Sequence, residues 1–255
     1  MESEREVNHR AVIVTGASSG IGAAIAGLIG ANGFPVAVNF RTNEVAAAKV
    51  VREIESAGGR AVAIRGDISR EEEILQLFEV AERELGKIGG LVNNAAVTGG
   101  FTRVESLSTE AIAQVLAVNV AGTMLCSREA VRRMSLRNGG LGGSIVNISS
   151  VSARTGGADD WVHYAASKGA INTFTIGLAR EVAAEGIRVN VVAPGLIDTP
   201  LHAANGMPDR MNRVAPLIPM KRFGTPREVA EGVAWLLSSA ASYTTGAILE
   251  IGGGR

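Results

Sequence analysis

Short apolar segments alternate with longer amphipathic segments along most of this chain, and that alternation restricts the fold more than any other feature of the sequence. Residues 11–15, 36–41 and 60–65 are short runs rich in Val, Ile and Ala, as expected of buried strands. Residues 43–57 and 69–85 have the spacing of helices. Further strands are expected at residues 89–96, 143–150, 187–193 and 247–251, and further helices at residues 23–29, 108–133 and 228–238. Such alternation predicts an α/β fold, in which a parallel sheet is covered by helices on both faces.

Length and charge limit the kinds of partner that this chain can have. At 255 residues it has room for one large α/β domain or two small ones, and the unbroken alternation favours a single domain over residues 1–255. The 25 basic residues balance the 25 acidic ones, so no overall field attracts nucleic acid or an anionic membrane. Small molecules are therefore the expected partners.

The amino terminus and the cysteine content indicate a cytoplasmic protein. Residues 1–6 are mostly charged and lack the apolar centre of a secretory signal, and no apolar run approaches the length of a membrane span. Cys126 is the one cysteine, so it cannot form an intrachain disulfide, and no cysteine or histidine cluster accompanies it. We expect Cys126 to be a core residue and expect no metal site.

A glycine-rich turn, TGASSGIG at residues 15–22, follows the first expected strand and opens the first helix. Glycines allow the backbone to approach a pyrophosphate, and a helix amino terminus presents unpaired N–H groups to phosphate oxygens. The spacing is GxxxGxG rather than GxGxxG. Glycine-rich turns between a strand and a helix also occur without a nucleotide, so this motif allows both interpretations.

The end of the second strand is where dinucleotide-binding folds distinguish a ribose hydroxyl from a ribose phosphate. Proteins that bind NAD usually place a carboxylate there, whereas this chain has Phe40 and Arg41. A guanidinium group matches the acceptors of a phosphate, so Arg41 favours NADP over NAD. Ser19 supplies no second cation, and an ordinary surface arginine would give the same pattern.

Tyr164 and Lys168 are four residues apart, which places them on the same face of a helix. A free tyrosine ionises near pH ~10, and a neighbouring cation favours the phenolate and so lowers that pKa. Tyr164 can then act as a general acid or base. An amphipathic helix with an exposed lysine has the same spacing, so the pair gains its meaning from its surroundings.

Hydroxyl groups precede this helix at the carboxyl end of an expected strand, which is the end where parallel sheets bind their ligands. Ser150 can direct its hydroxyl at the substrate oxygen that Tyr164 protonates. It lies fourteen residues before Tyr164, and Ser149 and Ser152 remain alternatives. Serine at a strand end is also a common turn residue.

Taken together, the TGxxxGIG turn, the NNAA segment at residues 93–96, Asn119, Ser150, the YxxxK pair and Pro194-Gly195 resemble the short-chain dehydrogenase/reductase family. The resemblance covers nearly the whole chain and implies a Rossmann-type, doubly wound parallel sheet of seven strands in a homotetramer. It departs from many members by one extra residue between Ser150 and Tyr164.

The resemblance also assigns roles to residues. Asn119, Ser150, Tyr164 and Lys168 would be catalytic, with Asn119 interrupting its helix and holding a water through its main-chain carbonyl. An asparagine bonded within the core is the alternative for Asn119. Asp67 would contact adenine, although an aspartate at this junction is equally a helix cap. The implied cofactor contacts are Gly16, Ser18, Ser19, Gly20, Ile21, Gly22, Arg41, Asp67, Ile68, Asn94, Ala95, Tyr164, Lys168, Pro194, Gly195, Ile197 and Thr199.

The expected function is a reversible, NADP-dependent conversion between a carbonyl and a secondary alcohol. The sequence leaves the substrate open among 3-oxoacyl thioesters, sugars, steroids and small ketones. Prolines and methionines in residues 199–223 suggest a substrate lid there, and Trp161, His163 and His202 are possible substrate contacts. A dinucleotide-binding regulatory protein that has lost catalysis is the alternative function.

Overall fold

A single seven-stranded parallel sheet forms the centre of the molecule, in a computed structural model that describes residues 10–199 and 215–255. Its strand order is β3-β2-β1-β4-β5-β6-β7, and every neighbouring pair is parallel. The strands are β1 (Ala11–Val14), β2 (Val36–Phe40), β3 (Ala61–Arg65), β4 (Ile88–Asn93), β5 (Gly143–Ile148), β6 (Ile187–Pro194) and β7 (Ile248–Ile251). The expected Rossmann-type fold is confirmed.

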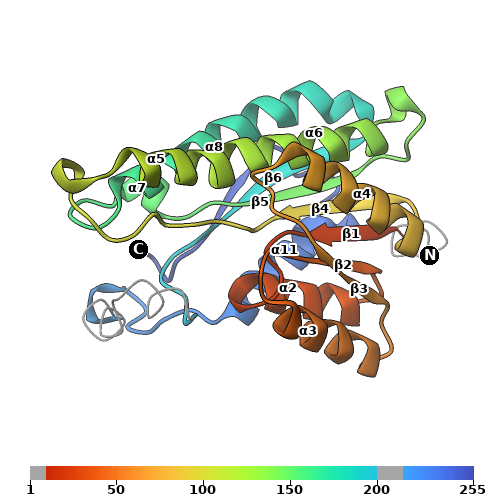
Figure 1. Ribbon diagram of the computed structural model, residues 1–255, viewed down its shortest axis with the longest axis horizontal. Coiled ribbons are helices and arrows are strands. Elements are labelled where there is room, and N and C mark those ends of the chain that lie inside the picture. Colours follow the sequence, from red (N-terminus) through yellow and green to blue (C-terminus); the bar gives the residue numbers. More distant parts are fainter. Residues whose placement is uncertain (1–9, 200–214) are drawn as a thin grey trace.

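Helices cover both faces of the sheet (Figure 1). On one face lie α2 (Gly20–Ala31), α3 (Glu44–Ser56) and α11 (Pro226–Leu237), and on the other lie α4 (Glu71–Leu85), α6 (Thr123–Met134) and α8 (Val162–Val182). Each face has its own cluster of buried apolar side chains, and β1 contributes to both clusters. Burial on both faces explains why the strand sequences are almost continuously apolar rather than alternating.

The strand order reverses direction beside β1. From β1 the chain adds β2 and then β3 on one side, and it afterwards crosses to the other side to form β4 and β5. The loops after β1 and β4 therefore leave the sheet in opposite directions, which opens a crevice at the carboxyl ends of these two strands. This is the position in which such sheets bind their ligands.

The helix expected at residues 108–133 is present but interrupted. It consists of α5 (Thr109–Val115), a π-helical segment (Leu116–Gly122) and α6. Asn119 lies within the π-helical segment, so the predicted local interruption occurs at that residue.

The stretch Thr109–Met134 also corrects the expectation that no segment approaches the length of a membrane span. By length and composition alone it is long and apolar enough to cross a membrane, with a mean hydropathy of 1.3 over its most apolar 18-residue window. In this fold, however, α6 lies against the sheet, with Cys126, Ala130 and Met134 fully buried. Cys126 is thus the core residue that the sequence suggested.

Candidate active site

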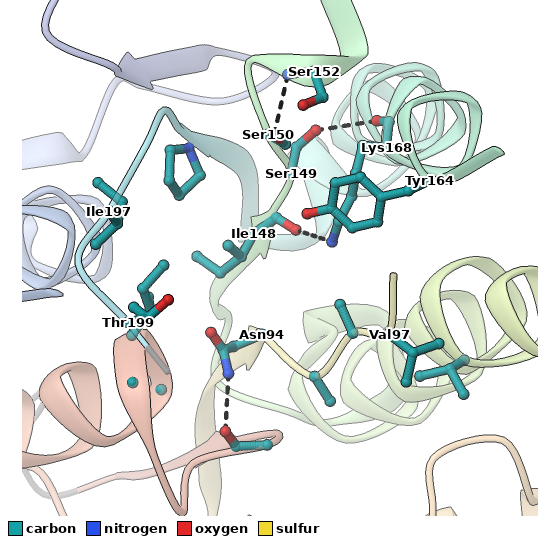
Figure 2. A pocket seen from close by; sticks show the side chains of 18 of the residues that line it. Asn94, Val97, Ile148, Ser149, Ser150, Ser152, Tyr164, Lys168, Ile197 and Thr199 are labelled. Atoms are coloured by element: carbon teal, nitrogen blue, oxygen red, sulfur yellow. Dashed lines mark hydrogen bonds between the residues drawn. The ribbon is translucent and has the colours of Figure 1, made fainter. Parts of the chain in front are cut away.

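A cleft of about 690 Å³ runs along the carboxyl ends of the strands. Every residue that the sequence assigned to catalysis or to cofactor binding lines this cleft, with the exception of Asn119. Segments from β1 to β6 contribute to its walls, so residues far apart in the chain meet there (Figure 2).

The glycine turn has a shape that only glycine permits at its first position. Gly16 has a φ of +61°, and a Cβ atom added there would lie 2.8 Å from the Cα atom of Ala95. The turn leads into α2, whose N-cap, Ser19, makes no side-chain capping bond to the helix. The first N–H groups of α2 consequently lack that internal acceptor, which is the arrangement that binds phosphate at a helix amino terminus.

Asn94, which follows β4, holds the glycine turn with its side chain. Its Nδ2 atom donates to the carbonyl oxygens of Thr15 at 2.9 Å and Gly16 at 3.0 Å, and its backbone N–H donates to Thr15 Oγ1 at 3.0 Å. A Cβ atom added to Gly22 would lie only 2.5 Å from this Nδ2 atom, so the position requires glycine. Asn94 lines the cleft as expected, but its amide also supports the turn.

Arg41 and Asp67, which follow β2 and β3, face each other across the part of the cleft that these two strands border. Arg41 Nη1 lies 3.9 Å from Asp67 Oδ2, and the Arg41 side chain is 53% exposed. Burial tends to raise the pKa of the Asp67 carboxyl, but hydrogen bonds from Ser69 and the charges of Arg41 and Arg70 outweigh it, so that pKa is lowered. Asp67 is therefore an anion that partly offsets the charge of Arg41.

The surroundings of Asp67 and Phe40 show what each residue can do. Asp67 does not cap the following helix, because α4 has Arg70 at its N-cap and Asp67 instead accepts bonds from the N–H and hydroxyl groups of Ser69. Phe40 is only 5% exposed and belongs to the core beneath β2. Phe40 also lines the cleft, so a carboxylate at position 40 would be largely removed from water there, whereas Arg41 beside it is exposed.

Lys168 and Tyr164 lie together on α8, as their spacing predicted (Figure 2). Lys168 Nζ donates to the carbonyl oxygen of Ile148 at 2.7 Å and lies 5.6 Å from the centroid of the Tyr164 ring. Both side chains are buried, with exposed fractions of 3% for Lys168 and 9% for Tyr164. The end of β5 therefore fixes the ammonium group beside the phenol.

Burial changes the acidity of both groups. It raises the pKa of Tyr164 to about 12, although a hydrogen bond with the Ser150 hydroxyl acts in the opposite direction. It lowers the pKa of Lys168 to about 8. The expectation that a neighbouring cation lowers the Tyr164 pKa is thus wrong for the free protein, in which desolvation of the phenolate dominates.

Among the three candidate serines, Ser150 is the one whose hydroxyl forms a hydrogen bond with Tyr164. Its Oγ atom accepts a bond from the backbone N–H of Ser152 at 3.1 Å, which leaves its proton for Tyr164 or a substrate oxygen. Ser149 is buried and donates to the carbonyl oxygen of Lys168 at 3.1 Å, a role in supporting α8. The extra residue in this loop leaves Ser150 close enough to Tyr164 for a hydrogen bond between the two side chains.

Replacing each serine by alanine tests this assignment. Ser150→Ala is expected to lower kcat/KM by about a hundredfold, a typical cost of removing one donor to a developing oxyanion. Ser152→Ala keeps the backbone N–H that orients Ser150, and Ser149→Ala removes a bond to the α8 backbone, so both should act mainly on the melting temperature. A larger loss of activity for Ser152→Ala than for Ser150→Ala would contradict the assignment.

Asn119 does not line the cleft, but it connects the loop after β4 to the catalytic helix. Its Oδ1 atom accepts from the Val97 N–H at 2.9 Å, and its Nδ2 atom donates to the Val97 carbonyl at 2.9 Å and to Ser167 Oγ at 3.0 Å. Ser167 in turn donates to the carbonyl oxygen of Tyr164 at 2.7 Å. Asn119 is thus bonded within the core, and no pattern in the sequence indicated its contact with Ser167.

The loop after β6 completes the wall opposite Tyr164. Pro194 ends β6, and Gly195, Ile197 and Thr199 follow it along the cleft. The Thr199 side chain lies above the glycine turn, because a Cβ atom on Gly20 would stand 3.6 Å from Thr199 Cγ2. This places the segment over the same turn that would hold the phosphates.

Of the three residues suggested as substrate contacts, one lines the cleft, one does not, and one lies outside the described residues. Trp161 lines the cleft, and its ring stacks on Phe101 with centroids 4.6 Å apart. His163 does not line it and is buried against Gly99, with no hydrogen-bond partner for either ring nitrogen. His202 lies outside the described residues.

Comparison with known proteins agrees with this geometry. The family model described as enoyl-(acyl carrier protein) reductase matches residues 16–255. The chain is 49% identical to the uncharacterized oxidoreductase YgfF of Escherichia coli, over 95% of this chain and 98% of that protein. It is 38% identical to glucose 1-dehydrogenase 2 of Bacillus subtilis, over 98% of this chain and 96% of that protein.

A solved structure is similar over almost the whole length. It is the crystal structure of a blue fluorescent protein from a metagenomic library in complex with NADPH, with a TM-score of 0.87 and 32% identity, covering 96% of this chain and 97% of that chain. The chain therefore belongs to the short-chain dehydrogenase/reductase family. It is an oxidoreductase that acts on alcohol and carbonyl groups.

Proposed function

We propose that this protein is an NADP-dependent oxidoreductase that interconverts a carbonyl compound and a secondary alcohol. The observation that carries the proposal is the meeting of Ser150, Tyr164 and Lys168 in the same cleft as the glycine turn. The residues fit a dinucleotide, because the glycine turn borders the cleft and packs so closely on Ala95 and Asn94 that a side chain at Gly16 or Gly22 would collide with them and displace the turn. The cofactor supplies the hydride in reduction.

Each residue then has a defined task during reduction. Ser150 donates a hydrogen bond to the carbonyl oxygen, and Tyr164 delivers a proton to the same oxygen as negative charge develops there. The raised pKa of Tyr164 keeps the phenol protonated at neutral pH, which is the form that an acid requires. Lys168 favours the phenolate that remains and binds ribose hydroxyls, and Asn119 holds a relay water.

Arg41 is the basis for preferring NADP. Its exposed guanidinium group stands at the end of β2, beside the cleft and opposite Asp67. Support also comes from the similar solved structure, which contains NADPH. We place Asp67, Ile68, Asn94 and Ala95 around the adenosine, and Ile197 and Thr199 near the nicotinamide carboxamide.

Arg41→Ala is expected to weaken NADPH binding about tenfold, because a charge-assisted bond to a phosphate typically contributes roughly 1.5–3 kcal/mol and Asp67 already offsets part of this charge. NADH has no phosphate at this position and should bind with unchanged affinity. The measurement is kcat/KM for both cofactors, with Arg52→Ala on the exposed side of α3 as the control. An equal loss of kcat/KM with NADPH and with NADH, or a parent protein that prefers NADH, would show that Arg41 is an ordinary surface arginine with no role in cofactor choice.

The substrate is proposed only as a class. A cyclic or linear secondary alcohol fits the family, and the named relatives include dehydrogenases of glucose, of a 3β-hydroxysteroid and of cis-4-hydroxycyclohexanecarboxylate. 3-Oxoacyl thioesters, sugars and small ketones are the compounds to screen. A screen that follows NADPH absorbance tests the proposal directly, and absence of turnover with every class despite tight NADPH binding would favour a silent dinucleotide-binding regulator.

We further propose one domain over residues 1–255, with a substrate lid at about 199–223. Residues 200–214 of that segment lie outside the described residues. In the part that the structure describes, Ile218 is 2% exposed while Leu217 and Met220 are largely exposed, which would suit a segment anchored at one point.

Assembly and location are proposed from the family resemblance. A homotetramer would cover Ile112, Leu116 and Met124, which are partly exposed apolar side chains along α5 to α6. Light scattering would test the tetramer. A cytoplasmic location is also proposed, and cell fractionation would test it.

A further inference from the structure

A buried asparagine in the middle of the cofactor half of the cleft has no role in the reaction described above. Asn39 is the fourth residue of β2, is 2% exposed, and lines the cleft beneath the glycine turn. A polar side chain in a strand that is buried on both faces is costly unless its groups are bonded. Its three hydrogen bonds therefore indicate what it does.

The side chain of Asn39 joins two loops that both border the cofactor site. Its Oδ1 atom accepts from the backbone N–H of Gly16 at 3.2 Å, and its Nδ2 atom donates to the carbonyl oxygens of Ile64 at 3.3 Å and Gly66 at 3.0 Å. Its own carbonyl oxygen accepts from the N–H of Ala17 at 2.8 Å. The turn after β1 and the turn after β3 are thus tied to the same residue.

These two turns would meet the cofactor at different places. Gly16 opens the turn that faces the phosphates, whereas Gly66 immediately precedes Asp67, on the adenosine side. Gly16 is held from the opposite side by Asn94, which donates to its carbonyl oxygen at 3.0 Å. A glycine turn has many accessible conformations, so fixing both its N–H and its carbonyl restricts it to one of them before the ligand arrives.

We propose that Asn39 is a positioning residue for the dinucleotide, which holds the phosphate-binding turn in register with the adenosine-binding turn. The inference rests on the proposed cofactor site but not on any substrate or reaction. Because Asn39 acts on the turns rather than on the ribose phosphate, it supports NADPH and NADH alike. Arg41, in contrast, distinguishes between them.

The test compares Asn39 with a second buried asparagine in the same sheet. Asn190 in β6 is 0% exposed, donates to the Thr244 carbonyl at 2.8 Å and accepts from the Ala247 N–H at 3.0 Å, but it does not line the cleft. Asn39→Ala and Asn190→Ala remove the same groups from comparable surroundings. Asn39→Leu, which fills the space without bonding, is the second variant at the proposed site.

We expect Asn39→Ala and Asn39→Leu to raise the Kd for NADPH and for NADH by a similar factor of about ten, measured by fluorescence titration without substrate. Hydrogen exchange of the peptide containing Gly16 should become faster in both variants. Asn190→Ala should lower the melting temperature but leave both Kd values and that peptide unchanged.

Three results would overturn the inference: an unchanged Kd in Asn39→Ala, a loss for one cofactor alone, or an equal loss in Asn190→Ala. If both Asn39 variants fail to fold while Asn190→Ala folds, Asn39 is a stability residue and the inference also fails. A parent protein that binds neither cofactor would instead refute the proposed function.

Discussion

Tyr164→Phe is expected to lower kcat/KM by about 10²–10⁴, the usual contribution of a positioned general acid. The change removes one hydroxyl group and keeps the ring, which is 9% exposed and lies beside Trp161 with centroids 5.0 Å apart. The lost proton donor matters in the transition state and contributes little to the ground state. Affinity for NADPH should therefore be retained, as measured by fluorescence titration.

The chain provides a matched control for this variant. Tyr243 is the other of its two tyrosines and is fully exposed. Tyr243→Phe makes the same chemical change away from the cleft and should leave kcat/KM at the parent value. Residual activity of Tyr164→Phe above about a tenth of the parent value would refute the mechanism.

The acidity of Tyr164 adds a pH dependence with a definite sign. Its pKa is raised to about 12 by burial, so the phenol is protonated at neutral pH and can act as an acid in reduction. Oxidation of the alcohol requires the opposite form, the phenolate, whose population increases with pH. The rate of oxidation by the parent should consequently rise toward alkaline pH, and Tyr164→Phe should lose that rise.

Lys168→Met is expected to reduce activity and cofactor affinity together. It removes the ammonium group that lies 5.6 Å from the Tyr164 ring centroid, so the phenolate formed in reduction loses its neighbouring charge. The expected loss in kcat is about 10²–10³, as for other preorganised donors at a developing charge. The Kd for NADPH should rise about tenfold with the loss of a ribose contact.

Stability must be measured in the same variant, because Lys168 Nζ donates to the Ile148 carbonyl at 2.7 Å and the change leaves that buried oxygen without this partner. Methionine fills most of the space of the lysine stem, which limits the cavity. Lys49→Met, at an exposed site paired with Glu53, is the control. An unchanged Kd for NADPH would show that Lys168 has no ribose role, even if kcat falls.

Local sequence patterns predicted much of the site because several of its residues belong to short motifs with a fixed spacing. The TGxxxGIG turn and the YxxxK pair each depend on a fixed spacing within one strand-to-helix turn or one helix, and the structure places both along the cleft. Asn39 was not singled out, although a polar residue inside the apolar segment Val36–Phe40 is itself a signal of a buried bonded group.

The acidity of Tyr164 and Lys168 could not be predicted from their spacing. A lysine four residues from a tyrosine indicates a lower phenol pKa, whereas the structure raises it to about 12 through burial. Spacing along a helix reveals which charges are neighbours, but desolvation depends on what other segments bring to cover the group.

What the sequence by itself determined is the parallel α/β fold and the order of its elements, which follow from periodicity, and, through the family resemblance, most of the residues that line the cleft at the carboxyl ends of the strands. Only the tertiary structure decided which groups Ser149 and Ser150 bond, how Asn39 and Asn94 hold the glycine turn, and that burial raises the pKa of Tyr164 and lowers that of Lys168. These depend on contacts between segments distant in the chain and on the exclusion of water, neither of which local spacing encodes.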